Sequence, residues 1–143
     1  MSSIGDCLKK RLLRKEAPDI EKARKAIEVS EQRFLDADIS LDSGVNSAVI
    51  LLAYASMFHV SRALLFRDGY TERSHYCLAE FIKENYINKG LISPKFAHLL
   101  NNAREERHEV LYGLEKTETR KDAELVLESA RDYIKEIKKI MGL

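Results

Sequence analysis

Apolar residues recur along most of the chain at intervals of three and four, with polar residues between them. This spacing places apolar side chains on one face of an α-helix, so the pattern predicts helices. The two prolines and six glycines lie at the ends of the periodic segments rather than inside them. No stretch shows the alternation of a half-buried strand, and we therefore expect an all-α protein with five helices.

The first two predicted helices differ in how much of their surface is apolar. One begins near Pro18, which suits a first-turn position, and runs to about Ala37 with a charged outer face. The next runs from about Asp42 to Arg67, is apolar almost all round and closes at Gly69. A helix that is apolar on every side is buried, so we expect this one at the centre of the fold.

Three further helices complete the prediction. The third is capped by Ser74, turns Leu78, Phe81 and Ile82 inward and stops by Gly90. The fourth opens with Ser93 as cap and Pro94 in its first turn, and continues to about residue 114. The fifth starts near Thr119, keeps its apolar residues at spacings of three and four, and ends in lysines that complement its dipole.

The fourth helix contains an arginine where its apolar stripe predicts a core residue. Projection at ~100° per residue puts Arg107 in the middle of the stripe formed by positions 96, 100, 103, 110 or 111, and 114. Arg104, His108 and Tyr112 form a ladder beside it. The glutamates 105, 106 and 109 project to the opposite side, where we expect a solvated face.

A buried guanidinium is costly unless it is paired, or unless its face opens on a cleft or a subunit boundary. One interpretation is that Arg107 pairs with a carboxylate inside the fold, in which case Arg62 on the central helix needs its own partner. The other is that Arg104, Arg107 and Arg62 bind phosphate, because guanidinium forks match phosphate oxygens. A neighbouring imidazole such as His108 can move protons near neutral pH.

No metal or cofactor is predicted. Glu105 and His108 have the Glu-x-x-His spacing of half a di-iron site, but the central helix supplies no glutamate for the other half. No phosphate-cradling glycine loop, catalytic triad or nucleotide fingerprint is present either. Most enzyme classes are therefore excluded.

The chain of 143 residues predicts one domain, residues 1–143, with a basic N-terminal segment at 1–16. Its 24 basic and 23 acidic residues give no global field, so an anion site has to be a local cluster. The basic run at residues 9–15 could touch a phosphate backbone, although basic runs near a terminus are usually only solvated.

The cysteines and the longest apolar run bear on location. Cys7 and Cys77 are too few and too far apart in sequence to suggest a disulfide framework, so we expect reduced thiols and a cytoplasmic protein. The stretch from Val45 to Phe66 is long enough for a membrane span but is interrupted by polar residues, so we expect a buried helix and no membrane contact.

Two segments carry a resemblance to a known family. AYASMFHVSRALLFRDGYTERSHYCLAEF, followed by GLISPKFAHLLNNAREERHEVLYG, resembles the prokaryotic HEPN family, and the flanking helices extend the likeness over most of the chain. The resemblance implies an antiparallel up-and-down bundle of four to five helices that forms a homodimer. It also implies a small nucleotidyltransferase as partner, in a toxin–antitoxin-like pair.

Active members of that family are metal-independent ribonucleases whose signature is an arginine followed, after four to six residues, by a histidine. Arg107 matches the arginine, but after four intervening residues the chain has Tyr112, and His108 is directly adjacent. A phenol is a poorer general base at pH 7 than an imidazole, since its pKa is ~10. The resemblance therefore favours a dimeric module that binds a nucleotide or RNA. The alternatives are a ribonuclease that uses Arg107 with His108 or Tyr112, and a purely structural dimer.

Overall fold

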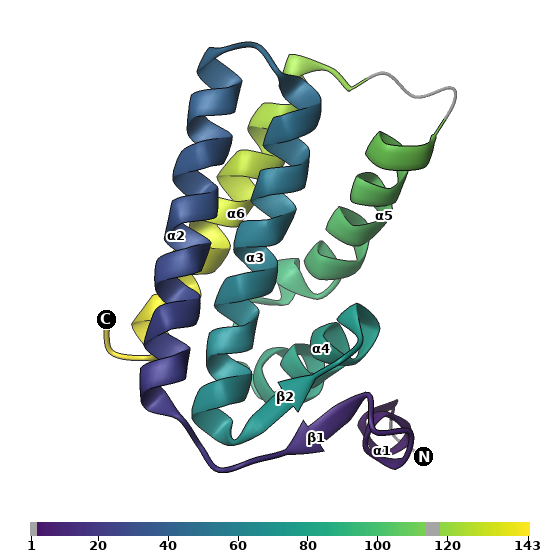
Figure 1. Ribbon diagram of the computed structural model, residues 1–143, viewed down its shortest axis with the longest axis vertical. Coiled ribbons are helices and arrows are strands. Elements are labelled where there is room, and N and C mark those ends of the chain that lie inside the picture. Colours follow the sequence, from purple (N-terminus) through teal and green to yellow (C-terminus); the bar gives the residue numbers. More distant parts are fainter. Residues whose placement is uncertain (1–2, 114–117) are drawn as a thin grey trace.

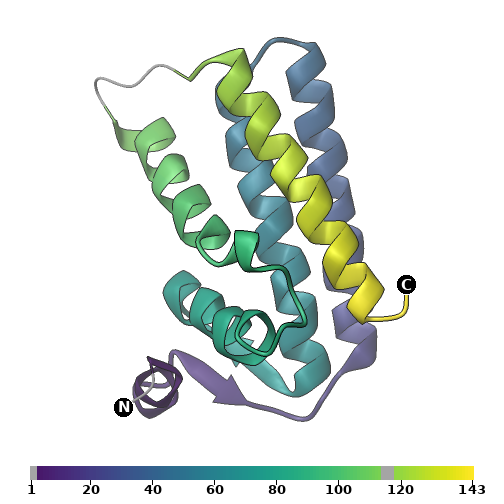
Figure 2. The same cartoon turned by 180° about the vertical axis from the view of Figure 1, so that it is seen from behind.

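The computed structural model describes residues 3–113 and 118–143, and within α5 it leaves the side chains of residues 103, 104, 106 and 107 undescribed. The described chain is all-α apart from two three-residue strands, which confirms the predicted fold class. Three long helices lie side by side: α2 (Ile20–Asp42), α3 (Asn46–Asp68) and α6 (Arg120–Ile140) (Figure 1). The shorter helices α4 and α5 lie on the other side of α3 (Figure 2).

Helix α3 is the centre of the fold, as its unbroken apolar sequence predicts. Its side chains Val49, Ala53 and Met57 are all fully buried, and α2, α4, α5 and α6 all contact it. It is the one helix in the described ranges that is long and apolar enough to cross a membrane, and 67% of its most apolar window is buried inside the protein. The prediction of a buried helix is confirmed.

The helix ends follow the capping signals in the sequence. Asp19 caps α2 by accepting a hydrogen bond from the Lys22 amide, so α2 begins just after Pro18 and runs beyond the predicted end at Ala37. Gly69 ends α3 in the left-handed conformation, with φ of 89°. Thr119 forms a capping box with Asp122 at the start of α6.

The segment between α3 and α6 is more broken than the sequence predicts. Ser74 caps α4 (His75–Ile82), as expected, and α4 continues as a π-helical turn over Lys83–Ile87. The predicted fourth helix is wrong at its start, because Pro94–Phe96 form a separate 3₁₀ turn and Ser93 makes no capping bond. Helix α5 (Leu99–Tyr112) begins only after His98.

Two short strands contradict the expectation of a chain without β-structure. Strand β1 (Leu13–Lys15) pairs antiparallel with β2 (Tyr70–Glu72), with Leu13 opposite Glu72. Three residues are too few to show the alternation by which a strand is recognised, so the sequence pattern could not predict them. The pairing brings the N-terminal segment onto the end of α3 and the start of α4.

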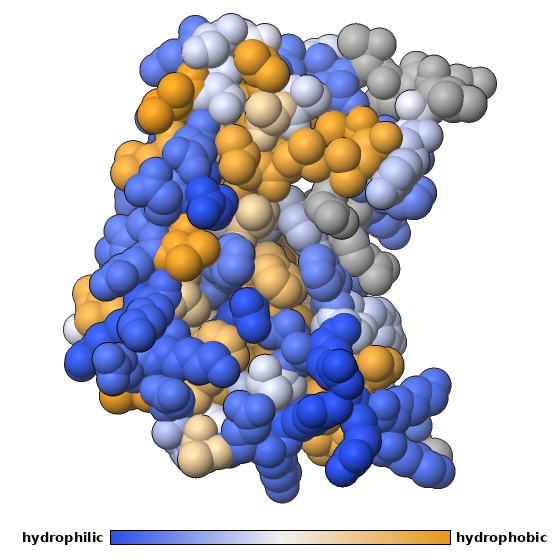
Figure 3. All heavy atoms as spheres, viewed as in Figure 1, coloured by the Kyte–Doolittle hydropathy of each residue, from blue (hydrophilic) through white to orange (hydrophobic). Residues whose placement is uncertain are grey.

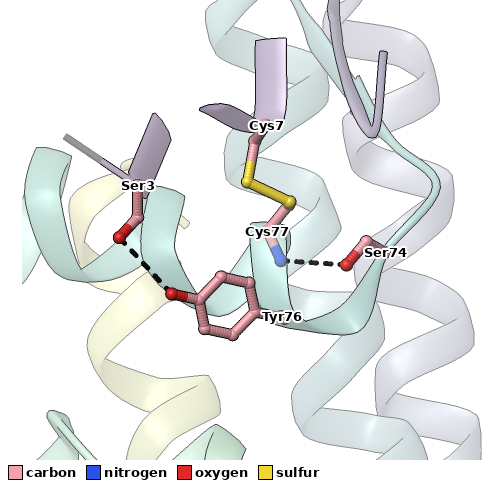
Figure 4. Close-up of a disulfide and its surroundings, with 5 residues drawn as sticks. All are labelled: Ser3, Cys7, Ser74, Tyr76 and Cys77. Atoms are coloured by element: carbon pink, nitrogen blue, oxygen red, sulfur yellow. Dashed lines mark hydrogen bonds between the residues drawn. A yellow bond between two sulfur atoms is a disulfide. The ribbon is translucent and has the colours of Figure 1, made fainter. Parts of the chain in front are cut away.

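The expectation of two reduced thiols was wrong, because Cys7 and Cys77 form a disulfide with a Cα–Cα distance of 5.9 Å. Cys7 lies on α1 (Ser3–Lys9), a helix that the sequence reading missed, and Cys77 lies on α4 (Figure 4). Separation along the chain says little about separation in space, and here the β1–β2 pairing places the two residues together. The cytoplasmic expectation therefore loses the support it drew from free thiols.

Candidate functional site

Helix α5, which carries the predicted site, is anchored to the core at its N-terminal end. The Phe96 ring packs on the Tyr133 ring of α6 at a centroid distance of 5.3 Å, and Leu100 is 8% exposed. From there α5 diverges from the three long helices toward its C-terminal end, as both ribbon views show (Figures 1 and 2). The site therefore lies on the half of the helix that has the least cover.

The apolar stripe of α5 becomes exposed along the helix. Leu100 is buried and Val110 is half-buried, but Leu111 is 45% exposed, and Tyr112 of the neighbouring ladder is 68% exposed. The expectation that the whole stripe faces the core thus holds only at the first turns. On the face seen in Figure 3, apolar side chains run from the upper part of α3 across to α5. This apolar surface is open to solvent within the single chain.

The structure brings His108 and Tyr112 together, as their spacing of four predicts. Their ring centroids are 5.0 Å apart with an interplanar angle of 51°, and both side chains are exposed. Glu105 and Glu109 are also exposed, as expected. Arg104 and Arg107 belong to α5, but their side chains lie outside the described part of the chain, so their predicted phosphate contacts stay predictions.

Asn101 is a site candidate that the sequence reading missed. Its side-chain oxygen Oδ1 is buried and has no hydrogen-bond partner among the described residues. A buried acceptor without a partner is costly, and such atoms are often found where a ligand or water binds. Asn101 is seven residues before His108 and eleven before Tyr112, so the three share one face of α5. This spacing is the sequence signal that could have identified Asn101 as a site candidate.

The third predicted phosphate ligand, Arg62, has a partner within the chain. Its Nε donates to Oε1 of Glu72 at 2.7 Å, and the Glu72 side chain is only 6% exposed. Burial raises the pKa of the Glu72 carboxyl, and the Arg62 charge opposes that rise. This is the partner that an internal Arg62 was expected to require.

A group of stacked rings surrounds this ion pair. The His75 ring stacks on Phe58 at 4.4 Å, and its Nδ1 is hydrogen-bonded to the Tyr54 hydroxyl. His59 lies edge-on to Phe58, and its pKa is lowered by burial and then by the positive charges of Arg62 and Arg33. The His59 imidazole is therefore neutral at pH 7. The His75 and His59 side chains thus pack against other rings of the same chain.

Among the residues that the structure describes, no three His, Cys, Asp or Glu side chains gather as a metal site requires.

The fold and the site define a class of small helical proteins in which one helix of the bundle carries a polar ladder on an open apolar face. The HEPN domain model matches residues 14–140, so the chain belongs to the HEPN domain family. The resemblance inferred from the sequence is confirmed. The matched region begins at β1 and leaves α1 outside.

Two relatives extend the comparison. The chain is 30% identical over 87 residues to "UPF0332 protein PH1297" of Pyrococcus horikoshii, a match that covers 61% of each protein. It is 24% identical over 121 residues to "Putative toxin MJ0605" of Methanocaldococcus jannaschii, which covers 85% of this chain and 90% of the relative. The chain thus spans less than two thirds of the first relative's length.

Proposed function

We propose that the protein is a dimeric module that binds a nucleotide or RNA through the second half of α5. The observation that carries the proposal is the open apolar face beside which the His108 and Tyr112 rings lie 5.0 Å apart, on the same helix as Arg104 and Arg107. Arginines match phosphate oxygens, and exposed aromatic rings provide surfaces on which bases stack. The same few residues therefore offer both of the contacts that a nucleotide requires.

A second copy of the chain is the proposed cover for this face. Leu111 is 45% exposed on the stripe that begins with the buried Leu100, so part of the stripe is unburied in a single chain. An isologous contact would bury this surface against its own copy and place two ladders at one boundary. The homodimer is the arrangement that the family resemblance also implies.

The proposal includes a small nucleotidyltransferase as partner, in a toxin–antitoxin-like pair in the cytoplasm. It is supported by membership of the HEPN domain family and by similarity to the relative named "Putative toxin MJ0605". A closed disulfide is compatible with this location in hyperthermophilic organisms, whose intracellular proteins are disulfide-rich. In mesophiles it would favour an oxidising compartment.

A ribonuclease is the second candidate, and the close approach of the His108 and Tyr112 rings favours it. In that mechanism the 2′-hydroxyl of RNA attacks the neighbouring phosphate and loses its proton to His108 or Tyr112 as base. The P–O5′ bond breaks, the 5′-oxygen leaves and takes up a proton, and a 2′,3′-cyclic phosphate remains on the other fragment. Arg104 and Arg107 stabilise the negative charge that develops on phosphorus oxygens. If neither candidate holds, α5 serves only to build a structural dimer.

The test measures binding and cleavage separately. Labelled single-stranded RNA is titrated with metal-free wild type, Arg107→Ala and Arg24→Ala, the last being a control on the exposed face of α2. The proposal predicts weaker binding for Arg107→Ala alone and intact RNA throughout. Cleavage that disappears in Arg107→Ala and His108→Ala would establish the ribonuclease. Equal binding by all three proteins would leave the structural dimer.

A further inference from the structure

The N-terminal segment carries a concentrated positive charge. Residues 9–15 include five basic side chains and no acidic one, whereas the whole chain has a net charge of +1. All five are exposed. We call them the N-terminal basic surface: Lys9, Lys10, Arg11, Arg14 and Lys15. In Figure 3 hydrophilic side chains cover the lower part of the molecule over β1. A polyanion would meet a dense group of positive charges here.

This surface is part of the folded structure. Leu13 is 1% exposed between Arg14 and the end of α1, and β1 is paired with β2. The Cys7–Cys77 disulfide fixes α1 to α4, and the Tyr76 hydroxyl donates to Ser3 Oγ beside it at 3.4 Å (Figure 4). A disordered basic tail loses conformational entropy when it binds. These residues are already ordered, so binding through them carries a smaller entropic cost.

Arg11 occupies a backbone conformation that ordinarily selects glycine. Its φ is 59°, the one positive φ at a non-glycine residue in the described ranges. The Arg11 amide bonds to the Leu8 carbonyl and the Leu12 amide to the Cys7 carbonyl, which is the Schellman ending of α1. An arginine there costs about 1–2 kcal/mol relative to glycine. Such strain is found most often at functional sites, where the side chain has a use.

The basic side chains also line a hollow. Its volume is about 380 Å³, and its walls are Leu8, Arg11, Leu13, Arg14 and Lys15. Two guanidinium groups and an ammonium group at the rim of one hollow can contact neighbouring phosphates of a single strand. The surface thus has the charge and the shape of a backbone contact.

We propose that the N-terminal basic surface binds the phosphate backbone of RNA as a second contact, apart from the α5 site. Helix α4 contacts both α1 and α5 and lies between them in both ribbon views, so the two surfaces are separate (Figures 1 and 2). The choice of RNA rests on the proposed function. An anionic membrane is disfavoured, since interfacial helices insert exposed apolar side chains, whereas Ile4, Leu8 and Leu12 pack against the core.

Arg11→Gly provides the sharpest test, because glycine relieves the left-handed strain while it removes the charge. The variant is expected to unfold at the same or a higher denaturant concentration than wild type, yet to bind labelled single-stranded RNA several-fold more weakly. Loss of binding therefore cannot be attributed to loss of folding. Unchanged RNA affinity in a folded Arg11→Gly protein would overturn the proposal.

Salt dependence gives an independent reading. Each phosphate contact on a single strand contributes ~0.7 to the slope of log affinity against log salt, so Arg14→Ala/Lys15→Ala should lower the slope by ~1.4. The matched control, Arg24→Ala/Lys25→Ala on α2, removes the same charge and should leave the slope unchanged. Equal slopes for the two double variants would contradict a local contact.

The proposals for the α5 site and for the N-terminal basic surface can be disproved separately. If Arg104→Ala/Arg107→Ala binds RNA like wild type while Arg11→Gly does not, the second contact stands and the α5 site is lost. If only the α5 variant weakens binding, the N-terminal proposal is overturned. It is also overturned if wild type binds no RNA, or if the N-terminal variants lose binding only to vesicles that contain phosphatidylserine.

Discussion

Residues 3–15 and the second half of α5 both combine basic side chains with apolar ones, but the apolar ones have opposite surroundings. In the N-terminal segment Leu13 is 1% exposed and Cys7 is bonded to α4. In α5 Leu111 is 45% exposed. The apolar side chains of the first region are buried within one chain, whereas the second region leaves apolar surface exposed. Charge alone does not distinguish the two regions, but the burial of the apolar residues beside the basic ones does.

The largest expected effect is on the N-terminal region. The Cys7–Cys77 disulfide joins residues 70 apart in sequence. A loop of that size stabilises the fold by about 4 kcal/mol in the chain-entropy model. Urea unfolding of Cys7→Ser/Cys77→Ser should therefore show a loss of that order, and wild type in reductant should follow the variant. A wild-type midpoint that is equal with and without reductant would mean that the disulfide is absent in solution.

The Arg62–Glu72 ion pair, whose glutamate belongs to β2, gives the next largest expected effect on stability. Arg62→Ala leaves the Glu72 carboxylate, 6% exposed, without its partner, which typically costs about 3 kcal/mol. Replacing both residues, as Arg62→Met/Glu72→Leu, should restore most of that stability. Chemical denaturation of the two variants checks the difference. If Arg62 is instead held free for phosphate, Arg62→Ala will weaken RNA binding and leave stability almost unchanged.

Two leucines on one stripe of α5 test the contrast within a single helix. Leu100 is 8% exposed, so Leu100→Ala should destabilise the fold by about 3 kcal/mol. Leu111 is exposed, so Leu111→Ala should cost about 0.5 kcal/mol or less in the dissociated chain. Thermal unfolding at low protein concentration compares them. Equal losses would show that the second half of α5 is packed within the chain.

The smallest effect concerns pH. Burial holds the pKa of His59 below its ordinary value of 6.5, so near that pH the unfolded chain takes up a proton before the folded one. Stability should therefore fall as pH drops below about 6.5 and be insensitive to His59 above it. In His59→Gln this part of the pH dependence should vanish. A profile identical to wild type between pH 7 and pH 5 would show that His59 titrates normally.

The sequence predicted what depends on local pattern and missed what depends on distant pairing. The burial of α3 follows from residue spacing, and the Ser74 and Thr119 caps follow from local hydrogen bonds. The β1–β2 pair and the disulfide join segments far apart in the chain, and three-residue strands carry no pattern. On α5, spacing predicted that the His108 and Tyr112 side chains lie together, but the exposure of Leu111 depends on how far the helix diverges from α3.

The central claim is that the α5 face is completed by a second copy and that RNA binds there. Sedimentation of wild type and Leu111→Glu, each with and without labelled single-stranded RNA, tests it most directly. The account predicts a wild-type dimer that binds RNA, and a folded Leu111→Glu monomer that has lost most of its RNA affinity. A Leu111→Glu monomer that binds RNA as tightly as wild type, or a wild type that is monomeric, would contradict it.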